Sequence, residues 1–125
     1  MVFSEEANKE AAFFNLAIDY IYDNLHNKIL LEEIAQAAGL SDSYLSKLFH
    51  KETGKNISEY IITKRVDAAK NLLMFTEYTT SEISNFLNFS SESHFIATFK
   101  KHTGITPKKF RLYNFRNRVY NQDEL

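Results

Sequence analysis

The side chains best suited to recognition chemistry in this sequence are short hydroxyls and a few cations at helical spacing. Four of them recur with gaps of three, one and three residues: Ser43, Ser46, Lys47 and His50. At 100° per residue they share one helix face, and Leu45, Leu48 and Phe49 lie opposite. Small donors can approach base edges and donate to guanine or thymine acceptors. A solvated face would carry more glutamate, so this face favours DNA contacts.

A second stretch about fifty residues later has the same pattern but different chemistry. If Phe95, Thr98 and Phe99 face inward, one face exposes these residues: Ser93, Ala97 and Lys100, with Ile96 at its edge. Exposed apolar side chains are unusual on a solvated helix face. Ile96 and Ala97 would either contact thymine methyl groups or be partly buried, and both interpretations stand.

Charge is distributed unevenly along the chain, although the net charge is only −1. Residues 1–40 hold seven acidic and two basic residues, whereas residues 93–122 hold seven basic residues and no acidic one: Lys100, Lys101, Lys108, Lys109, Arg111, Arg116 and Arg118. A basic surface suits phosphate, and on charge alone a merely solvated basic face explains it equally well. The predicted phosphate contacts are His50, Lys100, Lys101 and Lys108.

The composition argues against catalysis, metal binding and membrane insertion. Cysteine is absent, which excludes disulfides, thiolate metal sites and a cysteine nucleophile. The four histidines lack ligand-like spacing, and neither a glycine-rich phosphate loop nor a nucleophile elbow occurs. No apolar run approaches the roughly 20 residues of a membrane span, and no signal peptide is evident. We therefore expect a cytoplasmic protein that is not an enzyme and has no metal, cofactor or membrane partner.

Helical periodicity dominates the sequence, which has only three glycines and one proline. It predicts an all-α fold of seven helices, at about residues 6–25, 31–38, 42–53, 57–75, 81–87, 91–103 and 107–119. Ser41 and Thr106 have the residue types and positions of N-caps. Asn56 with Glu59 forms a capping box, and Pro107 occupies a first helical position.

The sequence also repeats itself internally. Residues 34–41 align with 83–90 at an offset of 49, and residues 43–60 align with 93–110 at an offset of 50. Each copy predicts a short helix, a tight turn and a longer helix, with Gly39 and Asn88 at the turn position that needs positive φ. This is the helix-turn-helix arrangement, whose second helix enters the DNA major groove. A helical repeat used only for stacking is the alternative.

Residues 89–111 resemble the C-terminal signature of the AraC/XylS family of bacterial transcription regulators. Three further segments match the family pattern. The first is residues 39–41 with 44–45, and the second is residues 49–54. The third lies in the connecting helix and consists of Tyr60, Arg65, Val66, Ala69, Leu72 and Leu73. The resemblance covers about residues 14–113 and its spacing is specific.

That resemblance implies one seven-helix DNA-binding domain over residues 1–125. It comprises a first helix-turn-helix at about 31–54, a linker helix at about 57–76, a second helix-turn-helix at about 80–104 and a C-terminal helix at about 107–119. The implied partners are double-stranded promoter DNA and RNA polymerase, with an effector-binding or dimerisation domain absent from this chain. A linker of about 20 residues spans roughly 30 Å, close to the ~34 Å between successive major grooves.

The family's base-contacting positions fall on Ser43, Ser46 and Lys47 in the first unit, and on four residues in the second: Glu92, Ser93, Ile96 and Ala97. Two departures stand out: Asn88 replaces the usual glycine, and Ala97 stands where many members carry arginine. The second departure puts direct base recognition by the second unit in doubt. The rival class is a helical protein-interaction module, whose binding would lack the steep salt dependence of DNA binding.

Overall fold

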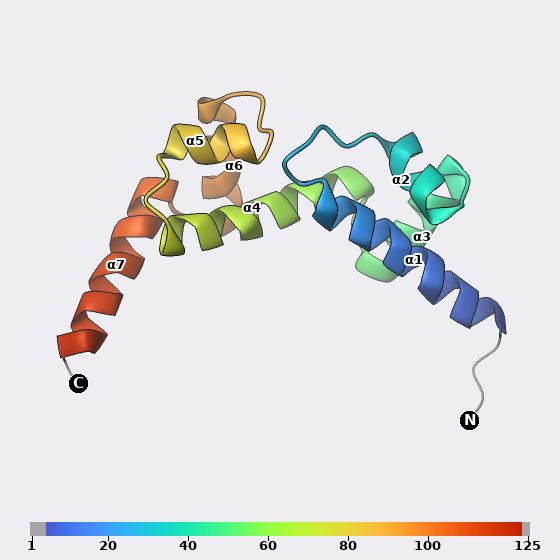
Figure 1. Ribbon diagram of the computed structural model, residues 1–125, viewed down its shortest axis with the longest axis horizontal. Coiled ribbons are helices and arrows are strands. Elements are labelled where there is room, and N and C mark those ends of the chain that lie inside the picture. Colours follow the sequence, from blue (N-terminus) through green and yellow to red (C-terminus); the bar gives the residue numbers. More distant parts are fainter. Residues whose placement is uncertain (1–4, 124–125) are drawn as a thin grey trace. The chain divides into compact units, whose positions relative to one another are not determined.

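The computed structural model describes the backbone of residues 5–123 and the side chains of residues 5–115. Within that range the chain forms seven α-helices and no strand, which confirms the predicted all-α class (Figure 1). Their bounds are α1 Glu5–Asp23, α2 Leu31–Ala38, α3 Asp42–Thr53, α4 Ile57–Phe75, α5 Thr80–Phe86, α6 Glu92–Thr103 and α7 Pro107–Asp123. None of these helices is both long and apolar enough to cross a bilayer.

The helices belong to two compact units, Met1–Ile62 and Thr63–Leu125, called unit 1 and unit 2 below. Unit 1 contains α1, α2, α3 and the first residues of α4 (Figure 1). Unit 2 contains the rest of α4 with α5, α6 and α7. The boundary therefore lies inside the helix that joins the two repeats.

The core of unit 1 is built around Phe49, whose side chain is fully buried. Its ring lies 5.1 Å from that of Phe14 on α1 and 5.3 Å from that of Tyr60 on α4, between centroids. Tilted and edge-on pairs at these distances are favourable aromatic geometries. The helices α1, α3 and α4 thus share one aromatic contact region.

The core of unit 2 repeats this arrangement with a chain of rings. Phe95 lies 4.9 Å from Phe89 and 5.9 Å from Phe99, and Phe99 lies 5.4 Å from Phe110 on α7. Arg111 donates from Nε to the carbonyl of Leu73 at 3.1 Å and from Nη2 to that of Thr76 at 3.3 Å. A cation at the carbonyl of Leu73 in the last turn of α4, and at that of Thr76 just after it, satisfies groups that a helix end leaves unpaired. Those bonds connect α7 to the end of α4.

The two tight turns have matching backbone geometry. Gly39 has φ 72° and Asn88 has φ 59°, so both take the left-handed conformation that the alignment predicts for them. After α2, the N–H of Leu40 donates to the carbonyl of Ala35 at 2.9 Å. After α5, the N–H of Phe89 donates to the carbonyl of Ser84 at 3.0 Å. Asparagine therefore forms the same turn as glycine, as its tolerance of this conformation allows.

Side-chain caps locate the one-residue difference between the repeats. Ser41 accepts a hydrogen bond from the N–H of Tyr44 at 3.2 Å, and Ser91 accepts one from the N–H of His94 at 3.0 Å. The cap of α6 is therefore Ser91, fifty residues after Ser41. Ser90, which the alignment pairs with Ser41, is the extra residue, and its Oγ lies 3.2 Å from Nδ1 of His94.

The repeat also identifies a polar atom in an apolar position. Ser84 on α5 is 0% exposed, and its Oγ has no hydrogen-bond partner among the described residues. The equivalent residue of unit 1, 49 positions earlier, is Ala35, which is also buried. A buried hydroxyl without a partner costs about 1–3 kcal/mol.

We therefore expect Ser84→Ala to raise the free energy of unfolding by about 1 kcal/mol or more, because it removes a desolvated hydroxyl without opening a large cavity. Urea unfolding followed by circular dichroism measures the change. Ala35→Ser is the matched control and should lower the same quantity. A less stable Ser84→Ala protein would mean that the hydroxyl is satisfied in solution.

Candidate nucleic-acid interface

The second helix of unit 1, α3, has one exposed polar face. Three side chains on its other side are buried: Leu45, Leu48 and Phe49. The four side chains predicted to meet DNA are all exposed: Ser43, Ser46, Lys47 and His50. The buried side fixes which way α3 faces, because its apolar residues lie in the core, where Phe49 packs against Phe14 of α1. The structure therefore brings these four residues together on one accessible surface.

The equivalent helix of unit 2, α6, has an exposed face of lower polarity. Phe95 and Phe99 are fully buried and set its orientation. Glu92, Ser93 and Ala97 are exposed, whereas Ile96 is partly buried. Of the two interpretations left open by the sequence, partial burial holds for Ile96 and not for Ala97. Ala97 is accessible to a ligand, and Ile96 contributes part of its surface to the packing of unit 2.

The predicted phosphate contacts of unit 2 lie near the end of α6 and the start of α7. Lys100, Lys101 and Lys108 are exposed, and none forms an ion pair with a described side chain. Thr106 accepts a hydrogen bond from the N–H of Lys109 at 3.2 Å, as expected of the predicted cap. The side chains of Arg116 and Arg118 lie outside those that the structure describes.

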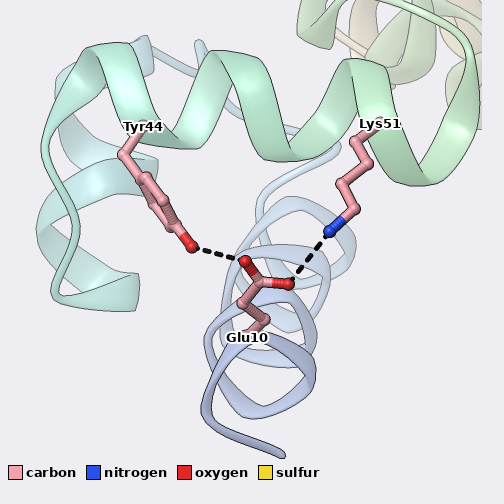
Figure 2. A network of polar contacts seen from close by, with 3 residues as sticks. All are labelled: Glu10, Tyr44 and Lys51. Atoms are coloured by element: carbon pink, nitrogen blue, oxygen red, sulfur yellow. Dashed lines mark hydrogen bonds and ion pairs between the residues drawn. The ribbon is translucent and has the colours of Figure 1, made fainter. Parts of the chain in front are cut away.

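A polar network on the flank of α3 has no counterpart in the sequence interpretation (Figure 2). The hydroxyl of Tyr44 donates to Oε1 of Glu10 at 2.8 Å, and Nζ of Lys51 donates to Oε2 of the same carboxylate at 3.2 Å. Glu10 belongs to α1, whereas Tyr44 and Lys51 belong to α3. We call these three residues the Glu10 network. Their separations of 34 and 41 residues leave no periodic signal by which sequence could have found them.

The electrostatics of the Glu10 network follow from its hydrogen bonds. Donation from Tyr44 and then from Lys51, together with the charge of Lys51, holds the pKa of Glu10 below its usual range. The bond to Glu10 raises the pKa of Tyr44, because the hydroxyl must keep its proton in order to donate it. At neutral pH Glu10 is therefore a carboxylate and Tyr44 is a neutral donor.

The described residues contain no candidate metal site. No three histidine, aspartate or glutamate side chains within the described range gather closely enough to hold a metal ion.

Comparison with known proteins places this arrangement in a family. A sequence model of a helix-turn-helix domain matches residues 34–112, which include both repeats. The HTH-type transcriptional regulator YtdP of Bacillus subtilis is 33% identical over 108 residues, which are 84% of this chain and 14% of that protein. The Msm operon regulatory protein of Streptococcus mutans is 35% identical over 108 residues, which are 86% of this chain and 39% of that protein. The chain therefore spans less than half the length of either relative.

Solved structures show the same fold. A transcriptional regulator of Chromobacterium violaceum with an AraC-type DNA-binding domain superposes with a TM-score of 0.79 at 28% sequence identity. The match covers 82% of this chain and 91% of that one. The family model, the relatives and this structure agree with the resemblance carried by residues 89–111. The chain belongs to the AraC-type helix-turn-helix family of DNA-binding transcription regulators.

Proposed function

We propose that this chain binds double-stranded promoter DNA by inserting α3 and α6 into successive major grooves, and so serves as the DNA-binding part of a transcription regulator. The observation that carries the proposal is the pair of matched helix-turn-helix units, each with a second helix whose outer face is exposed. In such units the second helix is the one that meets base edges. All 125 residues would act as one DNA-binding domain without catalytic chemistry or a cofactor.

The proposed base contacts come from the exposed face of each second helix. In α3 they are Ser43, Ser46 and Lys47, and in α6 they are Glu92, Ser93, Ile96 and Ala97. Phosphate contacts come from His50, Lys100, Lys101 and Lys108, all of which are exposed. Phosphate contacts would supply most of the affinity, and base contacts would supply the selection.

The wider role follows from the family. RNA polymerase is the second partner that the resemblance implies, and the site of action would be the bacterial cytoplasm, where promoter DNA lies. We assign effector sensing or dimerisation to parts of such regulators outside these 125 residues.

Selection of bound sites from random duplex DNA tests the proposal directly. We expect a two-part site with centres about one helical turn, ~34 Å, apart. Binding to the selected site should weaken steeply as salt rises, because phosphate contacts release counterions. Recovery of no preferred sequence, together with salt-independent binding to a protein partner, would instead support a helical protein-interaction module.

The three exposed lysines of unit 2 give a quantitative version of this test. Replacing Lys100, Lys101 or Lys108 with alanine should weaken binding to all DNA sequences alike. Each true phosphate contact that is lost should reduce the slope of log K against log salt by about one. Fluorescence anisotropy titrations at several salt concentrations measure that slope. An unchanged slope in all three variants would mean that this basic surface faces away from DNA.

A further inference from the structure

Helix α1 faces the rest of unit 1 along a single stripe. Glu10, Phe14, Ala17 and Ile21 follow one another at intervals of four, three and four residues, which places them on one side of the helix. Ala17 and Ile21 are fully buried, and the ring of Phe14 contacts that of Phe49 on α3. Glu10 forms the outer end of this stripe. The contact between α1 and α3 is therefore apolar at one end and charged at the other.

The carboxylate of Glu10 contacts α3 at two points seven residues apart (Figure 2). Tyr44 and Lys51 differ by only about 20° around the helix axis, so both contacts lie on the same flank of α3. In the sequence, Tyr44 directly follows Ser43, and Lys51 directly follows His50. The Glu10 network thus runs beside the proposed DNA-contacting face, from its first residue to its last.

These contacts differ in kind from the packing behind α3. Apolar burial of Leu45 and Phe49 sets which side of α3 faces the unit, but it is non-directional and does not by itself specify the exact angle of the helix about its axis. Charge-assisted hydrogen bonds are directional. The bond from Tyr44 to Glu10 is 2.8 Å long, and the bond from Lys51 is longer, at 3.2 Å. Two of them on one flank oppose rotation of α3. Recognition sites need their contact residues held within about 0.5 Å and 10–20° of the productive geometry.

We propose that Glu10 is a positioning residue for DNA sequence recognition: through Tyr44 and Lys51 it fixes the angle at which α3 presents its exposed face to base edges. This inference rests on the proposed function. Glu10 lies outside residues 34–112, which the family model matches.

The described side chains of unit 2 form no equivalent contact, so unit 2 serves as an internal reference. The residue equivalent to Lys51 is Lys101, which is exposed and forms no ion pair with a described side chain. The residue equivalent to Tyr44 is His94, whose ring contacts Phe89 and lies near Ser90 in its own turn. A change confined to the Glu10 network should therefore leave recognition by α6 unaltered.

The test compares the sequence preferences of the wild-type chain with those of Glu10→Ala and Tyr44→Phe. Sites are selected from random duplex DNA, and the half read by α3 is identified as the half whose preference Lys47→Ala relaxes. In both variants the preference for the selected base should fall about three- to tenfold at one or two positions in that half. The half read by α6 should keep its wild-type preferences. Glu10→Gln should give a smaller loss, because its amide oxygen can still accept from Tyr44.

Tyr20→Phe is the matched control. The hydroxyl of Tyr20 donates to Oε2 of Glu33 at 2.7 Å, which joins α1 to α2 rather than to α3. Deleting this hydroxyl removes the same kind of bond from the same unit. The sequence preferences in both halves of the selected DNA site should stay at their wild-type level. Circular dichroism establishes that each variant is folded. General loss of stability lowers the active fraction but does not change the preferences of one half alone.

Two results would overturn this inference while leaving the proposed function intact. The first is that Glu10→Ala and Tyr44→Phe keep wild-type sequence preferences in the half of the site read by α3. The second is tighter binding by Glu10→Ala to all sequences with a steeper salt slope, since Glu10 would then only withhold Lys51 from phosphate. If the wild-type chain itself selects no sequence, the proposed function fails and this inference fails with it.

Discussion

DNA binding by Lys47→Ala is expected to be weaker than wild-type binding by about 1–3 kcal/mol, or roughly 5- to 150-fold, if Lys47 contacts a base. Lys47 is exposed on α3, and no hydrogen bond or ion pair ties it to a described side chain. It is the one long donor among Ser43, Ser46 and Lys47 on this face. Its ammonium group can reach an acceptor on guanine or thymine without breaking an internal contact.

The measurement for Lys47→Ala combines affinity with site selection. Preference should relax at one or two base pairs, and only in the half read by α3. Lys28→Ala is the control, because it removes an exposed lysine from the same unit in the segment between α1 and α2. That control should change affinity only slightly and preference not at all. Unchanged affinity and preference in Lys47→Ala would contradict the assignment of this face to base contacts.

The helical framework was predictable because its signals are local. Gly39 and Asn88 mark turns that require positive φ, and the structure gives both residues that conformation. Oδ1 of Asn56 accepts from the N–H of Glu59 at 2.9 Å, as the capping-box spacing indicates, and Nδ2 of Asn56 donates to the carboxylate of Glu59 at 3.0 Å. Helix ends were less certain: α1 ends at Asp23 rather than residue 25, and α7 continues to Asp123 rather than 119. Ends fray, and a stripe of apolar residues does not define them closely.

Features that depend on the folded arrangement could not be predicted. Glu10 meets Tyr44 and Lys51 only because α1 packs on α3, and a solvated acidic helix face would have the same sequence. The partial burial of Ile96 also depends on neighbours that a helical wheel does not include. The orientation of α3 was predictable, since burial of Leu45 and Phe49 needs only the helical period. The contacts of Glu10 with Tyr44 and Lys51 on the flank of α3 were not predictable.

The second large effect follows from the unequal faces of α3 and α6. The exposed face of α3 offers three hydrogen-bond donors, Ser43, Ser46 and Lys47. The face of α6 offers Ser93 as a donor and Glu92, which can only accept, for example from cytosine. Ala97 is exposed and presents only a methyl group, and Ile96 is partly buried. We expect the half read by α3 to be sharply specified and the half read by α6 to be loose and rich in A·T pairs, through thymine methyls and DNA shape.

Ala97→Arg should convert the loose half into a specified one. Ala97 occupies the position equivalent to Lys47, fifty residues later, so an arginine there would extend from the middle of the exposed face of α6. Arginine binds guanine through two hydrogen bonds, which gives about 1–3 kcal/mol of discrimination against other bases. Selection from random DNA should then show a new guanine preference in the α6 half, with the α3 half unchanged.

His102→Arg is the matched control for Ala97→Arg, because it adds a cation to the same helix about 180° away from Ser93. It should strengthen binding to all sequences slightly and create no base preference, since charge alone acts on phosphates. Equally strong sequence preferences in both halves of the wild-type site would contradict the expectation that α3 and α6 recognise DNA with different specificity. A guanine preference from both arginine variants would show that α6 meets DNA through a different face. A preference from Ala97→Arg alone would place the exposed methyl of Ala97 at a base edge, where the wild-type side chain can contact a thymine methyl but cannot form a hydrogen bond.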